Sequence, residues 1–420
     1  MEKFIVNQSS GTEGRYRGPH QLPPQLSPTW TRESCASAAT EARRTPSAPA
    51  IRETLAAHSC RRLTSLCEAV GFDRAAVRRA TSTLDKLMSL WGDRPIGETD
   101  GWVSDIADDN SPIEFSLVVS ESGPEVRMML EAHGGPSMSD QRRAALELTR
   151  SLADFPGVDL ERFWRIAELF LPAEFLGGKF ALWHSVCFSP RDNPTFKAYF
   201  NPQARSKAMA QALVRTALQE LGFPRAWPLL EQLAAARGPE SDELKYFALD
   251  LASDRLARVK VYFLHHHATP AELASACRTA QNPDAADAQG FALAMAGGAT
   301  KLSARPPYTC HSFVEGDGDR PREINLYVPA CAYAEDDQVL SARVVEYMQA
   351  QGMSSAVYQN ALARFAHRPL EAGIGIHSYV AASRRKGARR ITVYLSPELN
   401  RTFPRGSVPA APASAPRSTP

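Results

Sequence analysis

The sequence lacks several features that would assign it to a familiar class. No apolar run in its 420 residues approaches the roughly 20 residues that a membrane helix needs. Neither sign of charge is in excess, because 48 Lys and Arg balance 46 Asp and Glu. This balance argues against a general surface for nucleic acid. The N-terminus shows no basic segment followed by an apolar one, so we expect no secretory signal and a cytoplasmic protein that binds no membrane.

The cysteines also lack a pattern. There are seven, an odd number, and they are scattered along the chain without a CxxC pair. A disulfide framework or a structural zinc site needs paired and regularly spaced cysteines. We therefore expect reduced thiols, which again fits a cytoplasmic setting.

The two ends of the chain differ in composition from its middle. Residues 1–50 are rich in Pro, Ser, Thr, Gly and Arg and have little periodic hydrophobicity. Residues 404–420 are of the same kind and end in PAAPASAPRSTP. Such segments cannot bury enough apolar surface to fold, so we expect both to be disordered. Residues 54–400 are expected to form a single domain.

Within 54–400 the predicted elements repeat five times in the order helix, helix, strand, strand. The expected strands are 113–120, 125–132, 179–188, 195–201, 243–251, 257–264, 308–315, 322–329, 374–382 and 389–396. A repeat of this kind identifies one structural unit used several times. Ten strands with helices between successive pairs predict an α+β fold, a closed antiparallel barrel with its helices outside.

One predicted strand, ARVKVYF at 257–263, shows what such a barrel would enclose. Side chains alternate between the two faces of a strand, so Arg258, Lys260 and Tyr262 share a face and three apolar residues share the other. The same order recurs at Lys197 and Tyr199. If helices cover the apolar face, the cationic and phenolic face must line the interior.

An enclosed surface of cations and phenols indicates a specific chemistry. Buried cations are costly unless an anion meets them, and several together suit a diphosphate. Tyrosines can donate hydrogen bonds to phosphate, and their ring faces can stabilise a carbocation by up to about 2 kcal/mol each. A diphosphate and a carbocation in one chamber that excludes water indicate prenyl transfer. The residues concerned are Arg127, Lys197, Arg258, Lys260, Arg385, Tyr199, Tyr262, Tyr327, Tyr379 and Tyr394.

Several motifs in this order resemble those of a known family. They are SPIEFS at 111–116, Lys197-x-Tyr199, Arg258-x-Lys260-x-Tyr262 and the C-terminal run Tyr379…Arg385…Tyr394. The chain resembles aromatic prenyltransferases of the dimethylallyltryptophan synthase type, whose fold is a ten-stranded antiparallel barrel of ααββ repeats. The resemblance covers about residues 54–400, and the composition, rich in Ala and Arg, favours a bacterial member.

The resemblance implies roles for individual residues. Glu114 corresponds to the carboxylate that accepts the hydrogen bond of the indole N–H. Asn325 stands where relatives often carry a glutamine, and Lys245 is a further candidate, for binding the carboxylate of an amino-acid acceptor. The set that matches the family's diphosphate-binding and cation-shielding residues is Arg127, Lys197, Tyr199, Arg258, Lys260, Tyr262, Tyr327, Tyr379, Arg385 and Tyr394.

One position departs from the family pattern. His184 falls near the place where relatives that prenylate C4 of tryptophan carry a lysine implicated in the final proton transfer. A histidine titrates near neutral pH and could shuttle that proton. It could equally be a histidine packed on a strand. The position of prenylation on the indole therefore stays open.

Three patterns are not expected to carry function. Asp105, Asp108 and Asp109 look like a magnesium motif, but the run leads into a strand and lacks the helical spacing around a metal. The histidines at 265–267 directly follow a strand, which favours a solvated loop. The basic cluster at 384–390 falls on a hairpin turn, and the neutral net charge argues against nucleic acid.

The sequence thus predicts an enzyme that moves a dimethylallyl group from dimethylallyl diphosphate to the indole of tryptophan or a small derivative, by Friedel–Crafts alkylation. No cofactor or metal is expected to be required, with Mg²⁺ or Ca²⁺ at most stimulatory, in a monomer or homodimer. Two alternatives stay open. One is another aromatic acceptor, such as tyrosine or a hydroxynaphthalene, and the other is a non-catalytic barrel that binds an anion.

Overall fold

The computed structural model describes residues 52–98, 103–253, 255–281, 285–385 and 387–409. The side chains at 285, 286 and 385 are not described. The segment predicted to be disordered at 1–50 and the end of the predicted tail, from 410, lie outside the described residues.

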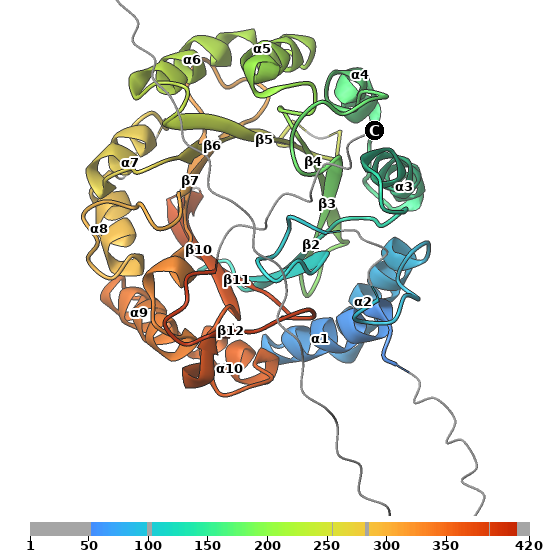
Figure 1. The fold of residues 1–420 in the computed structure, drawn as a ribbon, viewed down its shortest axis with the longest axis vertical. Helices are drawn as coiled ribbons and strands as arrows, with labels where there is room; N and C mark the ends of the chain where they lie inside the picture. The colour runs from blue at the N-terminus through green and yellow to red at the C-terminus, as the bar shows by residue number, and fades with distance from the viewer. Residues whose placement is uncertain (1–51, 99–102, 254, 282–284, 386, 410–420) are drawn as a thin grey trace, which may run out of the picture. The chain divides into compact units, whose positions relative to one another are not determined.

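In the described part of the chain, ten antiparallel strands form a closed barrel (Figure 1). Each strand pairs with the barrel strands before and after it, and β1 pairs with β11 to close the ring. The strands are β1 Ile113–Ser120, β2 Glu125–Leu130, β3 Leu182–Phe188, β4 Thr195–Phe200, β5 Asp242–Asp250, β6 Val259–His265, β7 Tyr308–Phe313, β8 Glu323–Val328, β10 His377–Arg385 and β11 Ala388–Leu395. The predicted fold is confirmed.

Helices surround the barrel as an outer ring, two for each pair of strands (Figure 1). They are α1 Leu55–Ala69, α2 Arg74–Met88, α3 Met138–Ser151, α4 Glu161–Phe170, α5 Ala210–Glu220, α6 Trp227–Ala236, α7 Pro270–Cys277, α8 Ala285–Met295, α9 Asp337–Ala350 and α10 Ala356–Phe365. Short 3-10 helices span Leu152–Asp154, Lys207–Met209, Pro224–Ala226, Ala330–Tyr333 and Leu370–Ala372. Within the described residues no helix is long and apolar enough to cross a membrane.

The same residue type joins the helices of three pairs. Gly71, Gly222 and Gly352 follow α1, α5 and α9 with φ of 86°, 84° and 71°. A residue with a side chain is strained in this left-handed region, whereas glycine is not. After Gly71 the Phe72 amide donates back to the carbonyl of Cys67 at 2.9 Å, and this bond ends the helix. Glycine therefore sets the tight junction between paired helices.

The two faces of the strands have different surroundings. The outward face is apolar and packs under the helices, where Phe200 of β4 lies 5.1 Å from Phe163 and 5.3 Å from Phe170 of α4, ring centre to ring centre. Phe247 of β5 continues this stack at 5.3 Å from Phe170. The inward face carries the polar residues. The alternation read from the sequence therefore holds, with helices on the apolar side.

A second, two-stranded sheet corrects two predicted boundaries. β9 Gly373–Ile374 pairs with β12 Phe403–Pro404, so the barrel strand predicted from 374 begins only at His377. Pro404 was predicted to start the disordered tail, but it lies in β12. Arg405 then pairs with Asp336 at 3.1 Å. These contacts extend the described fold beyond the expected end, because Arg405 and Gly406 bind Asp336 and Glu335 just before α9.

Candidate active site

The interior of the barrel holds two adjoining cavities that share part of their walls. The first, called here the cationic chamber, is surrounded by Arg127, Lys197, Arg258, Lys260 and Arg390. The second, the aromatic chamber, has a volume of about 380 Å³ and is walled by Trp183, Tyr246, Tyr262, Tyr308 and Tyr379. The residues that border both are Glu114, Met129, Tyr199, Tyr327 and Tyr394.

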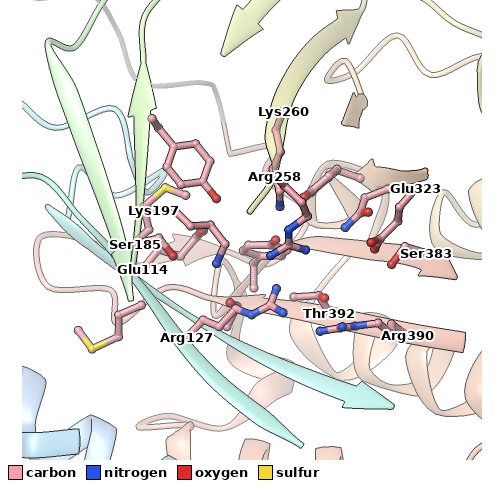
Figure 2. A pocket seen from close by; sticks show the side chains of 17 residues that line it. Glu114, Arg127, Ser185, Lys197, Arg258, Lys260, Glu323, Ser383, Arg390 and Thr392 are labelled. Carbon is pink, nitrogen blue, oxygen red and sulfur yellow. The ribbon is translucent and has the colours of Figure 1, made fainter. Parts of the chain in front are cut away.

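In the cationic chamber, side chains from different strands converge on one space (Figure 2). Arg127 extends from β2 and Arg390 from β11, and both bind Glu125, at 2.5 Å and 2.9 Å. Arg258, just before β6, binds Asp250 of β5 at 2.6 Å. Internal carboxylates therefore occupy the arginines, and the side chains leave only about 30 Å³ open.

The two lysines of the cationic chamber are less well compensated. Lys197 and Lys260 are 5% and 6% exposed, and no salt bridge to either is found among the described residues. Burial, and then the nearby Arg127 guanidinium, lower the pKa of Lys197 to about 7. Burial and Arg258 also lower the pKa of Lys260. Both ammonium groups would gain from an anion placed between them.

A belt of tyrosines connects the two chambers. Tyr262 lies with its ring centre 6.0 Å from both Tyr199 and Tyr327, and Tyr327 is 5.8 Å from Tyr394. Burial raises the pKa of Tyr199 to about 12 and raises those of the other phenols, so all are neutral near pH 7. Neutral phenols keep the electron-rich ring face and a hydrogen-bond donor without adding charge.

Glu114 lies at the boundary between the chambers. It is 7% exposed, on β1, and Ser378 of β10 donates a hydrogen bond to its Oε1 at 2.5 Å. Its neighbour Phe115 points the other way and packs against Phe365 of α10. Burial raises the pKa of Glu114 to about 8, although the Ser378 hydroxyl acts in the opposite direction. The structure thus places this carboxyl group on the interior, as the strand pattern predicted.

Three more of the predicted residues line the interior. Asn325 lies in the wall of the cationic chamber, and its Oδ1 is buried without a partner among the described atoms. Lys245 and Tyr379 line the aromatic chamber. The β5 register shifts between Leu244 and Tyr246, which turns Lys245 and Tyr246 toward the same cavity.

The predicted proton shuttle His184 is contradicted by its position. His184 is buried on the outward face of β3, where its Nε2 lies 2.8 Å from Thr149 Oγ1 of α3. Trp183 and Ser185, on either side of it, line the chambers instead. Burial lowers the pKa of His184 to about 3, so it is neutral. It belongs to the helix-packing layer, which was the alternative open from the sequence.

The basic hairpin contains a chamber residue that the sequence analysis did not select. Arg385 ends β10, and its side chain lies outside the described residues. Arg390 lines the cationic chamber. Arg390, Thr392 and Tyr394 alternate along β11 on one face, and this spacing from Tyr394 could have identified the arginine.

The aromatic chamber holds residues that no motif indicated. Trp183, Tyr246 and Tyr308 line it, with the ring centre of Tyr246 5.4 Å from Trp183 and 5.7 Å from Tyr308. Arg305 lies in the loop before β7, with its guanidinium carbon 4.7 Å from the ring centre of Tyr379. A loop residue has no strand alternation from which its direction can be inferred.

The patterns set aside earlier have structural partners. Asp108 forms a buried ion pair with Arg305. Asp109 accepts hydrogen bonds from the Ser111 and Ser396 hydroxyls. The prediction of a solvated loop for the histidines is wrong for His265, which is buried between Asp242 and Thr309 at 2.6 Å and 2.7 Å.

Comparison with known proteins agrees with this architecture. Residues 56–288 match the model of the tryptophan dimethylallyltransferase family. The chain belongs to this family. It is similar, at 30% identity, to 6-dimethylallyltryptophan synthase from Micromonospora olivasterospora in complex with DMASPP and Trp, with a TM-score of 0.79 over 84% of this chain and 99% of that one.

Two further solved members give the same result. 5-Dimethylallyltryptophan synthase from Streptomyces coelicolor, in complex with DMASPP and Trp, is 30% identical with a TM-score of 0.76, over 83% of this chain and 96% of that one. Prenyltransferase PriB, in ternary complex with L-tryptophan and dimethylallyl thiolodiphosphate, is 30% identical with a TM-score of 0.78, over 85% and 100%. The predicted activity, transfer of a dimethylallyl group to tryptophan, is confirmed at the level of the family.

Proposed function

We propose that the cationic chamber binds the diphosphate of the donor, the shared wall surrounds its dimethylallyl group, and the aromatic chamber receives the indole. The observation that carries this assignment is the common boundary. Glu114 and the tyrosines at 199, 327 and 394 border both cavities, so the bond between donor and acceptor would form among them. Cations on one side and rings on the other match the two substrates.

Binding of the donor involves an exchange of anions in the cationic chamber. Phosphate oxygens replace the carboxylates of Glu125 and Asp250 as partners of the arginines, which have to swing to make room. Lys197 and Lys260, to which no salt bridge is found among the described residues, gain a closely placed anion. Charge-assisted hydrogen bonds to phosphate are about twice as strong as neutral ones. Desolvated cations therefore favour diphosphate as a leaving group.

Loss of diphosphate leaves an allylic cation beside the tyrosine belt. The faces of neutral phenols stabilise such a cation, and the enclosed wall keeps water from it. The indole attacks with its π electrons while Glu114, as a carboxylate, accepts the hydrogen bond of the ring N–H. This bond raises the electron density of the ring. The ring proton then passes to the released diphosphate, the base that the reaction itself supplies, and aromaticity is restored.

We propose that a divalent metal is not required for this reaction. Five cationic side chains already surround the cationic chamber and can neutralise the charge that develops on diphosphate. Turnover should therefore persist in EDTA, measured as product formed from dimethylallyl diphosphate and tryptophan. Full dependence on added Mg²⁺ would contradict the proposal. Stimulation by Mg²⁺ or Ca²⁺ of up to about twofold is compatible with metal ions acting on free diphosphate.

Glu114→Gln tests the role of the carboxylate. The amide keeps the size of the side chain but cannot serve as an anionic acceptor, so we expect turnover to fall by about a hundredfold or more. Affinity for dimethylallyl thiolodiphosphate, measured by calorimetry, should stay within about threefold, because the proposed diphosphate contacts come from the cationic side chains and Glu114 lies only at the boundary of that chamber. Unchanged turnover would remove Glu114 from the mechanism. Loss of analogue binding would mean that the variant disturbs the whole chamber.

We also propose a cytoplasmic location. The cysteines among the described residues are free, as a reducing compartment requires: Cys60, Cys67, Cys187, Cys277, Cys310 and Cys331. Most of them are buried, and burial raises the pKa of Cys67 to about 12, which keeps that thiol unreactive. The fold therefore does not depend on oxidation.

A further inference from the structure

The seam between β8 and β10 is the shortest of the barrel. In the described chain the two strands pair at only three positions, the last of them Leu326 with Ala382. Beyond that point β8 still pairs with β7 as far as Glu323, and β10 still pairs with β11 as far as Arg385. The two strands therefore part toward the hairpin end of the barrel, the end that carries turns such as 121–124, while each keeps its other neighbour.

A surface groove lies outside this gap. It has a volume of about 330 Å³ and is lined by residues of α7 and α8 and by outward side chains of β8 and β10, among them Leu326 and Ala382. Glu323 and Ser383, one from each strand, line both this groove and the cationic chamber. Figure 2 shows the two side chains at the same edge of that chamber. The gap, called here the side window, therefore connects the chamber with the groove.

The side window opens beside the cations and not beside the tyrosine belt. Tyr327 of the belt still pairs with Ala381 across the seam. Asn325 and Glu323, on the same face of β8 but nearer the hairpin end, have no partner on β10. A closed seam at the belt keeps water from an allylic cation, whereas an opening at the hairpin end exposes only the leaving group.

The charges around the side window suit the passage of an anion. Lys260 lies on the chamber side, and Arg322 and Arg384 line the groove, where Arg322 also pairs with Asp317 at 2.9 Å. Glu323, between the two sides, is 8% exposed, and no described group forms a salt bridge or hydrogen bond with its carboxylate. A carboxylate raises the free energy of an anion held next to it. Glu323 therefore favours the departure of diphosphate over its retention in the opening.

We propose that diphosphate leaves the enzyme through the side window, so that it can depart while the aromatic chamber is still occupied. The inference rests on the proposed function, in which diphosphate occupies the cationic chamber. The alternative route runs past the tyrosine belt and the prenylated indole. A separate exit lets the two products depart in either order and prevents diphosphate from being trapped behind the acceptor.

A chase experiment on the wild-type enzyme distinguishes the two routes. Enzyme loaded with radiolabelled diphosphate is mixed with excess unlabelled diphosphate, with or without saturating tryptophan, and the retained label is followed by rapid filtration. Exit through the side window predicts that tryptophan changes the dissociation rate constant by no more than about twofold. A larger fall in the presence of tryptophan would show that the acceptor blocks the exit, and would overturn the proposal.

Ala288→Trp tests the same route from outside. Ala288 lies on α8 and lines the groove but not the cationic chamber, so a large ring there obstructs the groove without touching the substrates. Dissociation of labelled diphosphate should slow about fivefold or more, while formation of prenylated tryptophan in a single turnover stays within about twofold. Gln289→Trp is the matched control, because Gln289 is exposed on the same helix, and it should change neither rate.

Equal dissociation rates in Ala288→Trp and Gln289→Trp would overturn the side exit. So would a loss of single-turnover rate in Ala288→Trp as large as its loss of dissociation rate, because the substitution would then act on the whole chamber. The chase on the wild type decides the question even if Ala288→Trp does not fold. A wild-type enzyme that retains no labelled diphosphate would instead contradict the proposed function, on which the exit depends.

Discussion

The two faces of β6 show how differently the inside and the outside of this barrel are built. Val261 points outward, is fully buried and packs in the continuous apolar core beneath the helices. Lys260, one residue earlier, points inward, is almost as deeply buried and has no salt bridge among the described residues. On this strand the outward side chain is held by apolar packing, whereas the inward ammonium group is buried without a counter-ion among the described residues.

This difference has an energetic meaning. Burial of apolar surface contributes about 25 cal/mol per Å², so the outward face supplies stability. Burial of an ammonium group without a partner costs stability instead. The barrel closes in spite of that cost because helices cover its whole circumference (Figure 1). The unfavourable free energy of burying the interior ammonium groups is relieved when they bind a diphosphate, and this relief strengthens binding.

The largest expected effects come from substituting two adjacent residues of β6, one on each face. Lys260→Met should weaken binding of dimethylallyl thiolodiphosphate about tenfold to a hundredfold, because it removes a charge-assisted contact. Its midpoint of urea unfolding should not fall, since an uncompensated buried charge is lost. Binding by calorimetry and unfolding by circular dichroism measure the two effects.

Val261→Ala is the matched control on the other face. It should lower the free energy of unfolding by about 2 kcal/mol, because it removes buried methyl groups and leaves a cavity. Affinity of the folded protein for the analogue should stay within about twofold. If Lys260→Met lowered stability as much as Val261→Ala does, the two faces would not be divided in the way described.

We expect a smaller effect on kcat/KM from pH, through the titration of two interior groups. Glu114 must be ionised to accept the indole N–H, and its pKa is raised to about 8 by burial, so activity should rise with pH up to that value. Lys197 must be protonated to bind diphosphate, and its pKa is lowered to about 7 by burial, so donor binding should weaken above that value. A narrow maximum between about 7 and 8 follows. A flat profile from pH 6 to 9 would contradict both assignments.

His184→Gln should have the smallest effect on catalysis. The side chain lies under α3 and touches neither chamber, so turnover by the folded enzyme should change by no more than about twofold. Loss of the bond to Thr149 should lower stability by about 1 kcal/mol. A large fall in turnover, at unchanged stability, would restore the proton-shuttle hypothesis for a residue outside the barrel.

The fold and much of the interior could be predicted from the sequence, because the alternation of side chains between the two faces of a strand depends only on neighbouring residues. In β6 the order of charged, phenolic and apolar residues fixed which side chains share a face, and the repeat fixed the number of strands. The interior positions of Lys197, Tyr199 and Glu114 followed in the same way. Only the question of which face points into the barrel needed a further assumption, namely that helices cover the outside.

What could not be predicted depends on register between segments. His184 was placed by counting from Lys197, but Lys197 pairs with Ser185, so the histidine falls on the other face. The bulge in β5 turns Tyr246 into the aromatic chamber, and nothing local indicates it. Overlooking Arg390 reflects the same difficulty, because a basic hairpin offers several cations and the pairing of β11 with β1 decides which of them face inward.

The pairing of β1 with β11 also governs when the molecule becomes an enzyme during its synthesis. Ser116 and Tyr394, partners across that seam, come from near the opposite limits of the barrel sequence. Until the last strand leaves the ribosome, the first strand has an open edge that can pair with other chains. Such distant pairing is slow. Catalytic competence is therefore gained in one late step, when the final strand docks and seals the ring.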